Sequence, residues 1–174
     1  MSYLRFDKTL MTNLSDSLQK EVLRSNRSGA YACTTIVDCN TRKYHGLLVV
    51  PVPELDDENH VLLSSLDATV IQHGAEFNLG LHKYQGDNFS PRGHKYIREF
   101  DSLQVPTTTY RVGGVILKRE MMFQHFENRI IIRYTLVEAH SATTLRLQPV
   151  LACRSVREFT HENSGARRDY AVVE

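Results

Sequence analysis

The sequence predicts an all-β protein, an antiparallel β-sandwich with little helix. Segments of alternating apolar and polar residues recur at intervals of roughly 8–15 residues, and Gly-Gly or Asn-containing turn signals separate them. No long segment shows the i, i+3, i+4 spacing of an amphipathic helix. The chain has 174 residues, which is enough for one domain, so residues 1–174 are expected to form a single sandwich domain.

The composition argues against several classes of protein. The hydrophobic fraction is 41%, the charged fraction 24% and the formal net charge +1, with no basic stripe for nucleic acid. No apolar run approaches the ~18 residues of a membrane span, and the N-terminus lacks an apolar signal core. The three cysteines form no Cys-x-x-Cys motif, which favours neither disulfides nor zinc. We therefore expect a cytoplasmic protein with no metal, no cofactor, no nucleic-acid partner and no membrane partner.

The first quarter of the chain contains a helix signal, a turn and a strand. Ser15–Arg24 is predicted as a short helix with Ser15 as its N-cap, because leucines fall near helical spacing. Asn26–Gly29 supplies the residue types that turns need. Tyr31–Val37 is rich in Thr, Ile and Val, which favours a strand.

The stretch Asn40–Val50 is the strand around which the prediction is organised, paired with Tyr31–Val37 in an antiparallel hairpin. Its second half is apolar on both alternating faces, so it is expected to be buried on two sides. Its first half carries Arg42, Tyr44 and His45 into that buried region, where polar groups need partners.

The middle of the chain predicts further strands and one long loop. The acidic stretch 51–59 is expected to be a loop, and 61–66 and 68–73 read as strands followed by a turn and a short return at 77–79. Residues 80–93 contain Gly, Asn and Pro and are predicted to be a loop.

The second half of the chain alternates more clearly. His94–Phe100 is predicted as a strand, and Gly-Gly at 113–114 predicts a hairpin of Thr107–Val112 with Val115–Phe123. Arg129–Val137 and Thr143–Cys153 are the next two strands, and Pro149 places the second of these at a sheet edge or bulge. Residues 170–173 begin another strand, whose free edge would favour a homo-oligomer through strand-edge pairing.

Five motifs occur in a fixed order along the chain. They are Ser-Asn-Arg-Ser-Gly-Ala-Tyr-Ala (25–32), Asn-Thr-Arg-Lys-Tyr-His-Gly-Leu-Leu (40–48), Leu-Leu-Ser-Ser-Leu-Asp (62–67), Pro-Arg-Gly-His-Lys-Tyr (91–96) and Thr-Tyr-Arg-Val-Gly-Gly-Val (109–115). In this order they resemble the N-terminal domain of bacterial and archaeal glycogen debranching enzymes of the amylo-α-1,6-glucosidase type. The resemblance covers about residues 20–160.

The resemblance implies a large β-sandwich like the one that precedes the helical barrel of glucoamylase-like enzymes. It implies an accessory domain that supports folding, docking and substrate positioning, with an α-glucan as substrate and a C-terminal catalytic (α/α) barrel as partner. The catalytic carboxylates would lie in that barrel, outside this chain, so we name no catalytic residue and expect the domain alone to be inactive. The alternative is a stand-alone carbohydrate-binding or protein-interaction β-sandwich, and the part of the gene beyond Glu174 would distinguish the two.

Five residues are candidates for substrate binding or interdomain contact. For Arg42, Tyr44 and His45, one interpretation is an internal hydrogen-bond network that fixes strand order. The other is a surface that packs against the catalytic barrel and helps to shape the sugar cleft, since Arg and Tyr are favoured at interface centres. Asn26 and Arg92, placed on loops, share this ambiguity.

Overall fold

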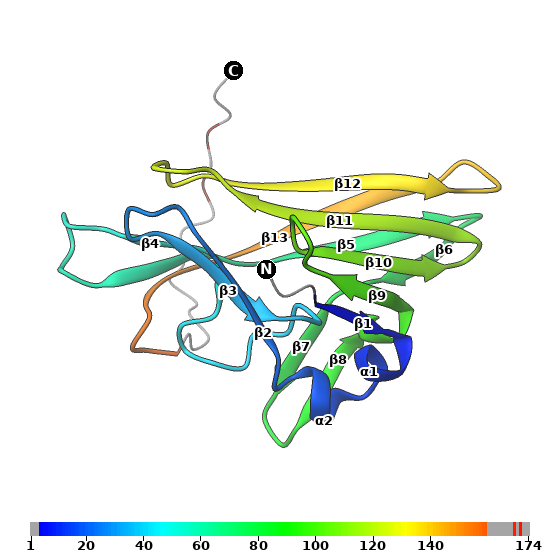
Figure 1. Cartoon of the computed structure of the whole chain (residues 1–174), viewed down its shortest axis with the longest axis horizontal. Coiled ribbons are helices and arrows are strands. Elements are labelled where there is room, and N and C mark those ends of the chain that lie inside the picture. The colour runs from blue at the N-terminus through cyan, green and yellow to red at the C-terminus, as the bar shows by residue number, and fades with distance from the viewer. Residues whose placement is uncertain (1–3, 160–168, 170, 172–174) are drawn as a thin grey trace.

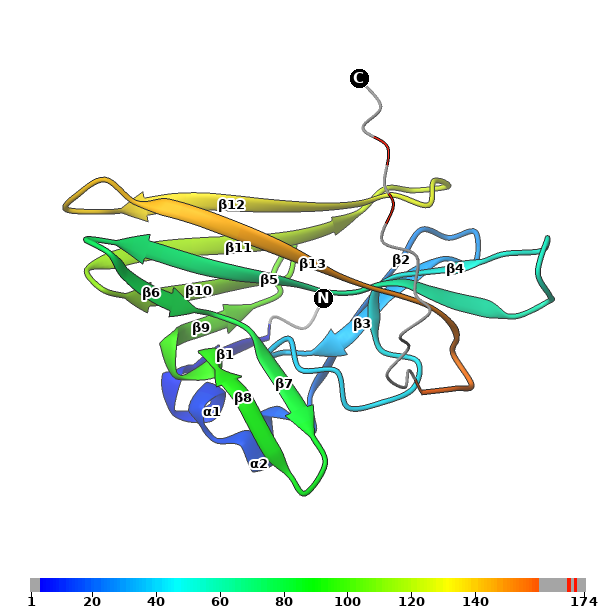
Figure 2. The same ribbon diagram turned by 180° about the vertical axis from the view of Figure 1, so that it is seen from behind.

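The computed structural model describes residues 4–159, 169 and 171, and within them it confirms an antiparallel β-sandwich. Figures 1 and 2 show two sheets packed face to face, with a small hairpin and the helices at one end. In strand order, the first sheet contains β1 (Arg5–Asp7), β9 (Ile97–Asp101), β10 (Thr107–Val112), β11 (Val115–Phe123) and β12 (Ile130–Glu138).

The second sheet holds the motif-bearing strands. Its order is β13 (Thr144–Ser155), β5 (Asn59–Gln72), β4 (Gly46–Pro51), β3 (Tyr31–Thr35) and β2 (Glu21–Ser25), and β6 (Ala75–Asn78) pairs with the far end of β5. A separate two-stranded sheet contains β7 (Leu81–Tyr84) and β8 (Asn88–Arg92). The helices are α1 (Lys8–Thr12), α2 (Leu14–Ser17) and the 3-10 helix η1 (Gly93–Tyr96).

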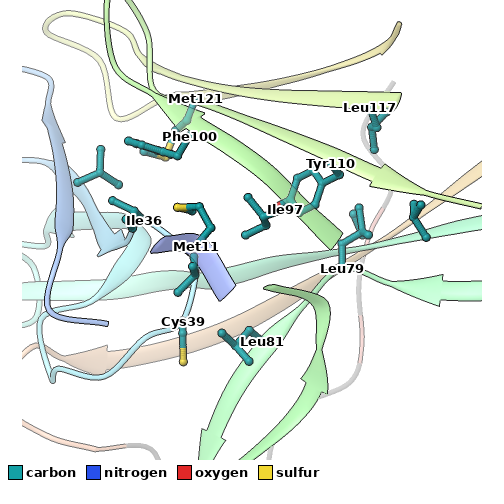
Figure 3. Close-up of a cluster of buried hydrophobic side chains, with 14 of the residues drawn as sticks. Met11, Ile36, Cys39, Leu79, Leu81, Ile97, Phe100, Tyr110, Leu117 and Met121 are labelled. Carbon is teal, nitrogen blue, oxygen red and sulfur yellow. The ribbon is translucent and has the colours of Figure 1, made fainter. Parts of the chain in front are cut away.

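The core lies between the two main sheets and contains apolar residues from strands of both sheets, together with residues between strands such as Ile36 and Leu79 (Figure 3). On β11, for example, Val115, Leu117 and Met121 are buried, while Lys118 between them is exposed. Met11 of α1 is fully buried and closes the core at the helical end. Burial of such side chains provides about 1.5–3 kcal/mol each, the main favourable term in folding.

Several strand predictions are confirmed. The hairpin around Gly113 and Gly114 has the predicted strand bounds, and β12 begins one residue later than predicted. β3 pairs with β4 in the antiparallel sense. β13 lies at the end of its sheet and its register shifts just after Pro149, as expected for a residue that cannot donate to the ladder.

The predicted helix at Ser15–Arg24 is wrong. α2 begins earlier, because the Asn13 side chain caps it by accepting from the Ser15 N–H at 3.1 Å. The chain then enters β2, where Val22 faces the core and its two neighbours face outward. The segment therefore forms a strand that buries alternate residues, although its leucines are spaced as they would be in a helix.

Three further predictions in the middle of the chain are corrected. The two strands predicted at 61–66 and 68–73 are one continuous strand, β5, which ends at Gln72. The loop predicted at 80–93 is the β7–β8 hairpin, anchored by the buried Leu81. The strand predicted from His94 begins only at Ile97, because residues 93–96 form η1. Glycine is needed at its first position, since a Cβ at Gly93 would lie 2.0 Å from the Leu79 carbonyl oxygen.

Of the strand predicted at 170–173, the structure describes only residue 171, so this prediction is not tested. Among those that the structure describes, no helix is long and apolar enough to cross a membrane.

Candidate functional site

An apolar groove runs over β2 and β3 on the side that faces away from the core. Strand alternation places Leu23 of β2 together with Tyr31 and Cys33 of β3 on this side, while Val22 and Ala32 point inward. Tyr44, from the turn before β4, lines the same groove. Its volume is about 470 Å³, and the Leu23 side chain is 57% exposed there. We call this surface the β2–β3 groove.

Residues 41–45 form a turn, not the first half of a strand as predicted. The Thr41 N–H donates to His45 Nδ1 at 3.0 Å, and the His45 N–H donates to the Arg42 carbonyl at 3.1 Å. The imidazole therefore supplies the acceptor that a ladder partner would supply in a strand. Of the three polar candidates only His45 is buried; Arg42 and Tyr44 are exposed at the groove.

β4 begins at Gly46, immediately after this turn. A Cβ there would lie 2.7 Å from Val61 Cγ1 and 2.9 Å from Val49 Cγ2. Glycine is therefore needed for the close approach of β4 to β5. Three consecutive residues thus have three different roles: Tyr44 lines the groove, His45 caps the turn, and Gly46 allows β4 to pack closely on β5.

Glu21 connects the three predicted candidates. Its carboxylate accepts from the Tyr44 hydroxyl at 3.3 Å, lies 3.2 Å from His45 Nε2 and lies 3.6 Å from Arg42 Nε. Sequence reasoning missed Glu21 because β2 was interpreted as a helix. The alternation of Glu21, Leu23 and Ser25 on one face is the signal that could have found it.

The protonation states at this carboxylate follow from burial and hydrogen bonding. Because Nδ1 of His45 accepts the Thr41 N–H, the neutral ring carries its proton on Nε2, which faces Glu21. Burial lowers the pKa of His45, and the nearby Glu21 carboxylate only partly opposes this. Burial and Glu21 together raise the pKa of Tyr44, so its hydroxyl remains a donor.

Glu21, Cys33 and His45 also have metal-ligand chemistry, with one candidate ligand atom of each within 4.8 Å of the others. The arrangement does not fit a metal centre. A ligating Nε2 must present its lone pair, but here Nδ1 accepts a backbone N–H and Nε2 holds the proton. Burial raises the pKa of Cys33 to about 11, so the thiolate that binds metal is disfavoured.

Asn26 is fully buried and links two turns. Its Oδ1 accepts from the Ser28 and Ala30 N–H groups at 2.8 and 3.0 Å, which fixes the β2–β3 turn. Its Nδ2 donates to the Glu127 carbonyl and to Asn128 Oδ1, both at 3.1 Å, across to the first sheet. Asn26 is therefore a positioning residue at one end of the groove.

The turn that Asn26 holds presents an aromatic ring to solvent. Phe126 donates its N–H to the Asn26 carbonyl at 2.7 Å and has a φ of 62°. Its side chain is 71% exposed. A left-handed conformation is strained for a bulky residue, so the Asn26 contact holds Phe126 in a position that its own preference opposes.

Arg92 is not brought to this surface. It ends β8, is exposed, and donates from Nε to the Phe89 carbonyl at 3.4 Å. It does not line the β2–β3 groove. Of the five predicted residues, four therefore lie at or around the groove and one lies on another hairpin.

A second hollow lies inside the sandwich and carries two carboxylates. Asp38 pairs with the buried Arg119 at 2.8 Å, and Asp67 pairs with His82 at 2.8 Å. The hollow has room for about 20 Å³, close to one water molecule. Its size and its paired charges suit a structural network rather than a sugar site.

Comparison with known families decides what kind of domain this is. A family model described as glycogen debranching enzyme N terminal matches residues 20–172. The chain belongs to this family. No match was found among curated proteins or among solved structures. The resemblance deduced from the five motifs is therefore confirmed. Within this debranching-enzyme N-terminal domain, two of those motifs, 25–32 and 40–48, meet at the β2–β3 groove.

Proposed function

We propose that this debranching-enzyme N-terminal domain is the accessory domain of an amylo-α-1,6-glucosidase, which hydrolyses branch points of glycogen-like α-glucans. The family match supports the assignment to a larger enzyme with a catalytic domain in the same chain. Hydrolysis of a glycosidic bond needs two carboxylates across a space that holds the sugar. Asp38 and Asp67 flank a hollow of about 20 Å³, which does not offer that space. We assign the chemistry to the catalytic barrel, as the family resemblance implies.

We infer that the β2–β3 groove is the face that docks on the catalytic barrel. The observation that carries this inference is the convergence of two family motifs on one exposed apolar surface. Leu23 and Tyr44 are 57% and 42% exposed there, and large apolar side chains gathered in one groove favour a protein contact. The Glu21 carboxylate at the groove already accepts from Tyr44 and faces His45.

The chemistry of the groove favours a protein surface over a bare sugar. Sugar sites present several convergent polar groups that are free to bind hydroxyls, whereas the groove has Leu23, Tyr31 and Cys33 along its length. Arg42, half-exposed and beside Glu21, provides the charged rim that interfaces commonly have. We propose that this rim helps to shape the sugar cleft once the two domains are docked.

The test is a binding measurement between the 174-residue chain and the separately produced catalytic domain of the same enzyme, by titration calorimetry. Leu23→Lys places a charge in the groove and should weaken binding by at least about tenfold. The matched control is Leu55→Lys, an exposed leucine in the acidic loop, which should bind as wild type does. Equal affinity for all three proteins would show that the groove is not the docking face. Saturable binding of maltooligosaccharide that Leu23→Lys abolishes would instead favour the carbohydrate-binding alternative.

A further inference from the structure

β12 is the least protected edge of the sandwich. At the other end of its sheet, β1 is only 3 residues long. At one end of the second sheet, β13 is interrupted by Pro149 and by register shifts, and at its other end β2 has only 5 residues. Proteins commonly protect edges in these ways. β12 has 9 residues, contains neither Pro nor Gly, and pairs only with β11 among the described strands.

β12 leaves three of its apolar residues exposed. Ile131, Leu136 and Val137 are exposed, while the one basic residue, Arg133, is held by Glu120 of β11 through two contacts of 2.7 Å. Figures 1 and 2 show the strand along the outer border of the sandwich, with its free edge away from β11. An exposed, long and apolar edge strand is a template for another strand.

The sandwich is also open beside this edge. β12 and β13 are consecutive strands in the chain but belong to different sheets. Between them lies a hollow of about 180 Å³ lined in part by Tyr134 and Leu136 of β12 and by Leu145 of β13. A strand added to β12 would cover this opening and remove the inward-facing Leu136 from water.

We propose that β12 pairs antiparallel with β12 of a second copy of this chain, around a twofold axis that is normal to the sheet and passes midway between the two Tyr134 residues. This pairing joins the two first sheets into one and uses the whole length of both strands. It sets Ile130 opposite Glu138, Ile131 opposite Val137, Ile132 opposite Leu136, and Arg133 opposite Thr135.

The sequence of β12 selects both the second copy and the register. In this register, apolar residues face apolar residues at two successive positions and no like charges meet, which favours a self-pair over an arbitrary strand. A shift of two residues in one direction would set Arg133 opposite Arg133 of the other copy. The same shift in the other direction leaves Ile130 and Ile131 without partners in the strand. A shift of one residue would place inward side chains against outward ones.

The experiment is sedimentation velocity on the 174-residue chain from about 1 to about 100 µM. The wild-type chain should show a species of twice its 20.0 kDa mass as concentration rises. The double substitution Ile131→Lys with Val137→Lys sets lysine against lysine at two places across the axis. It should weaken association by more than about tenfold. Leu147→Lys, at an exposed apolar position on β13, is the matched control and should dimerise as wild type does.

A charge exchange tests the register itself. Ile131→Glu combined with Val137→Lys sets glutamate opposite lysine of the other copy and should restore the dimer. Within one copy the two positions are six residues apart, or about 20 Å along the strand, well beyond the ~8 Å screening length. They therefore interact only across the axis. Circular dichroism and thermal unfolding at the lowest concentration check that each variant is folded.

Three results would overturn the proposal. The first is a wild-type chain that stays monomeric throughout the concentration range. The second is a folded double-lysine variant that dimerises as wild type does. The third is a Glu–Lys variant that stays as weak as the double-lysine variant, which would exclude this register. None of these measurements depends on the docking of a catalytic domain, so the proposal stands or fails separately from the proposed function.

Discussion

The Asn26 carbonyl accepts the N–H of Phe126 at 2.7 Å, and the same asparagine donates through its side chain to the Glu127 carbonyl, 101 residues away in sequence. One buried amide thus joins the β2–β3 turn of the second sheet to the β11–β12 turn of the first. Because every polar atom of the Asn26 side chain is bonded to backbone or to Asn128, the residue orders two turns at once.

The first prediction concerns this link. Asn26→Ala leaves two backbone N–H groups and one carbonyl without partners at a buried site, which should lower the free energy of unfolding by about 2–4 kcal/mol. Urea denaturation measures the change. The control is Asn88→Ala, since Asn88 is exposed and its side chain makes one hydrogen bond, to the Gln85 carbonyl; we expect less than about 1 kcal/mol there. Equal stability of the two variants would show that the link is not structural.

The second prediction concerns Phe126. Asparagine tolerates a φ of 62° better than phenylalanine does, and the Phe126 ring is largely exposed. Phe126→Asn should therefore stabilise the isolated domain by about 0.5–1 kcal/mol. Differential scanning calorimetry measures this. A lower melting temperature would mean that the ring contributes packing that its exposure does not suggest.

The third prediction concerns acid stability and His45. Burial lowers its pKa in the folded chain, so below the ordinary value of about 6.5 the unfolded chain binds a proton that the folded chain does not. Stability is then fully present above about pH 6.5 and is lost as the pH falls through the lowered folded pKa. His45→Gln should flatten this acid-side loss in urea unfolding between pH about 7.5 and about 5.5. An unchanged slope would contradict the assignment of a neutral buried ring.

His82 should behave in the opposite way. Its hydrogen bond with Asp67 raises its pKa, so the pair contributes stability that is fully present below about pH 6.5 and is lost as the pH rises through the raised folded pKa. His82→Gln should therefore destabilise the domain more at pH about 5.5 than at about 7.5. The same pair of urea curves tests both histidines. A loss that grows with rising pH would contradict this sign.

The fourth prediction concerns the buried ion pair. Asp38→Asn keeps a side chain that suits the φ of 57° at this position, but it leaves the Arg119 guanidinium buried without a counter-charge. We expect a loss of about 3–5 kcal/mol, measured by urea unfolding. Glu76→Gln, in an exposed pair with Arg146, is the control and should change stability little. Comparable effects at the two sites would show that the Arg119 charge is compensated elsewhere.

The strands of the second half were predictable because each carries its own signal. Gly113 and Gly114 mark the β10–β11 turn, and the alternation from Arg129 to Val137 predicts β12 nearly to the residue. Both the alternation of apolar and polar residues and a two-residue turn can be recognised within a few neighbouring residues of the sequence. The β7–β8 hairpin was missed because both strands are short and β8 contains Asn, Ser and Pro, which are typical of loops.

The candidate site was only partly predictable. Arg42, Tyr44 and His45 were identified from their motif, but the exposure of Arg42 and Tyr44 depends on a turn that the buried His45 side chain caps. Glu21 was hidden by leucines at helical spacing. The partners of the Asn26 Nδ2 group lie about a hundred residues away along the chain, so no local pattern could reveal that Asn26 joins two turns.

The most direct test of the account is a glucose-release assay on a branched limit dextrin. The two carboxylates of hydrolysis are assigned to the catalytic domain, so the purified 174-residue chain should release no glucose. Adding the catalytic domain should produce release, and the groove substitution Leu23→Lys should reduce it while Leu55→Lys should not. Glucose release by the chain alone, abolished by replacing one of its own carboxylates such as Asp38 or Asp67, would contradict the assignment of this domain as accessory.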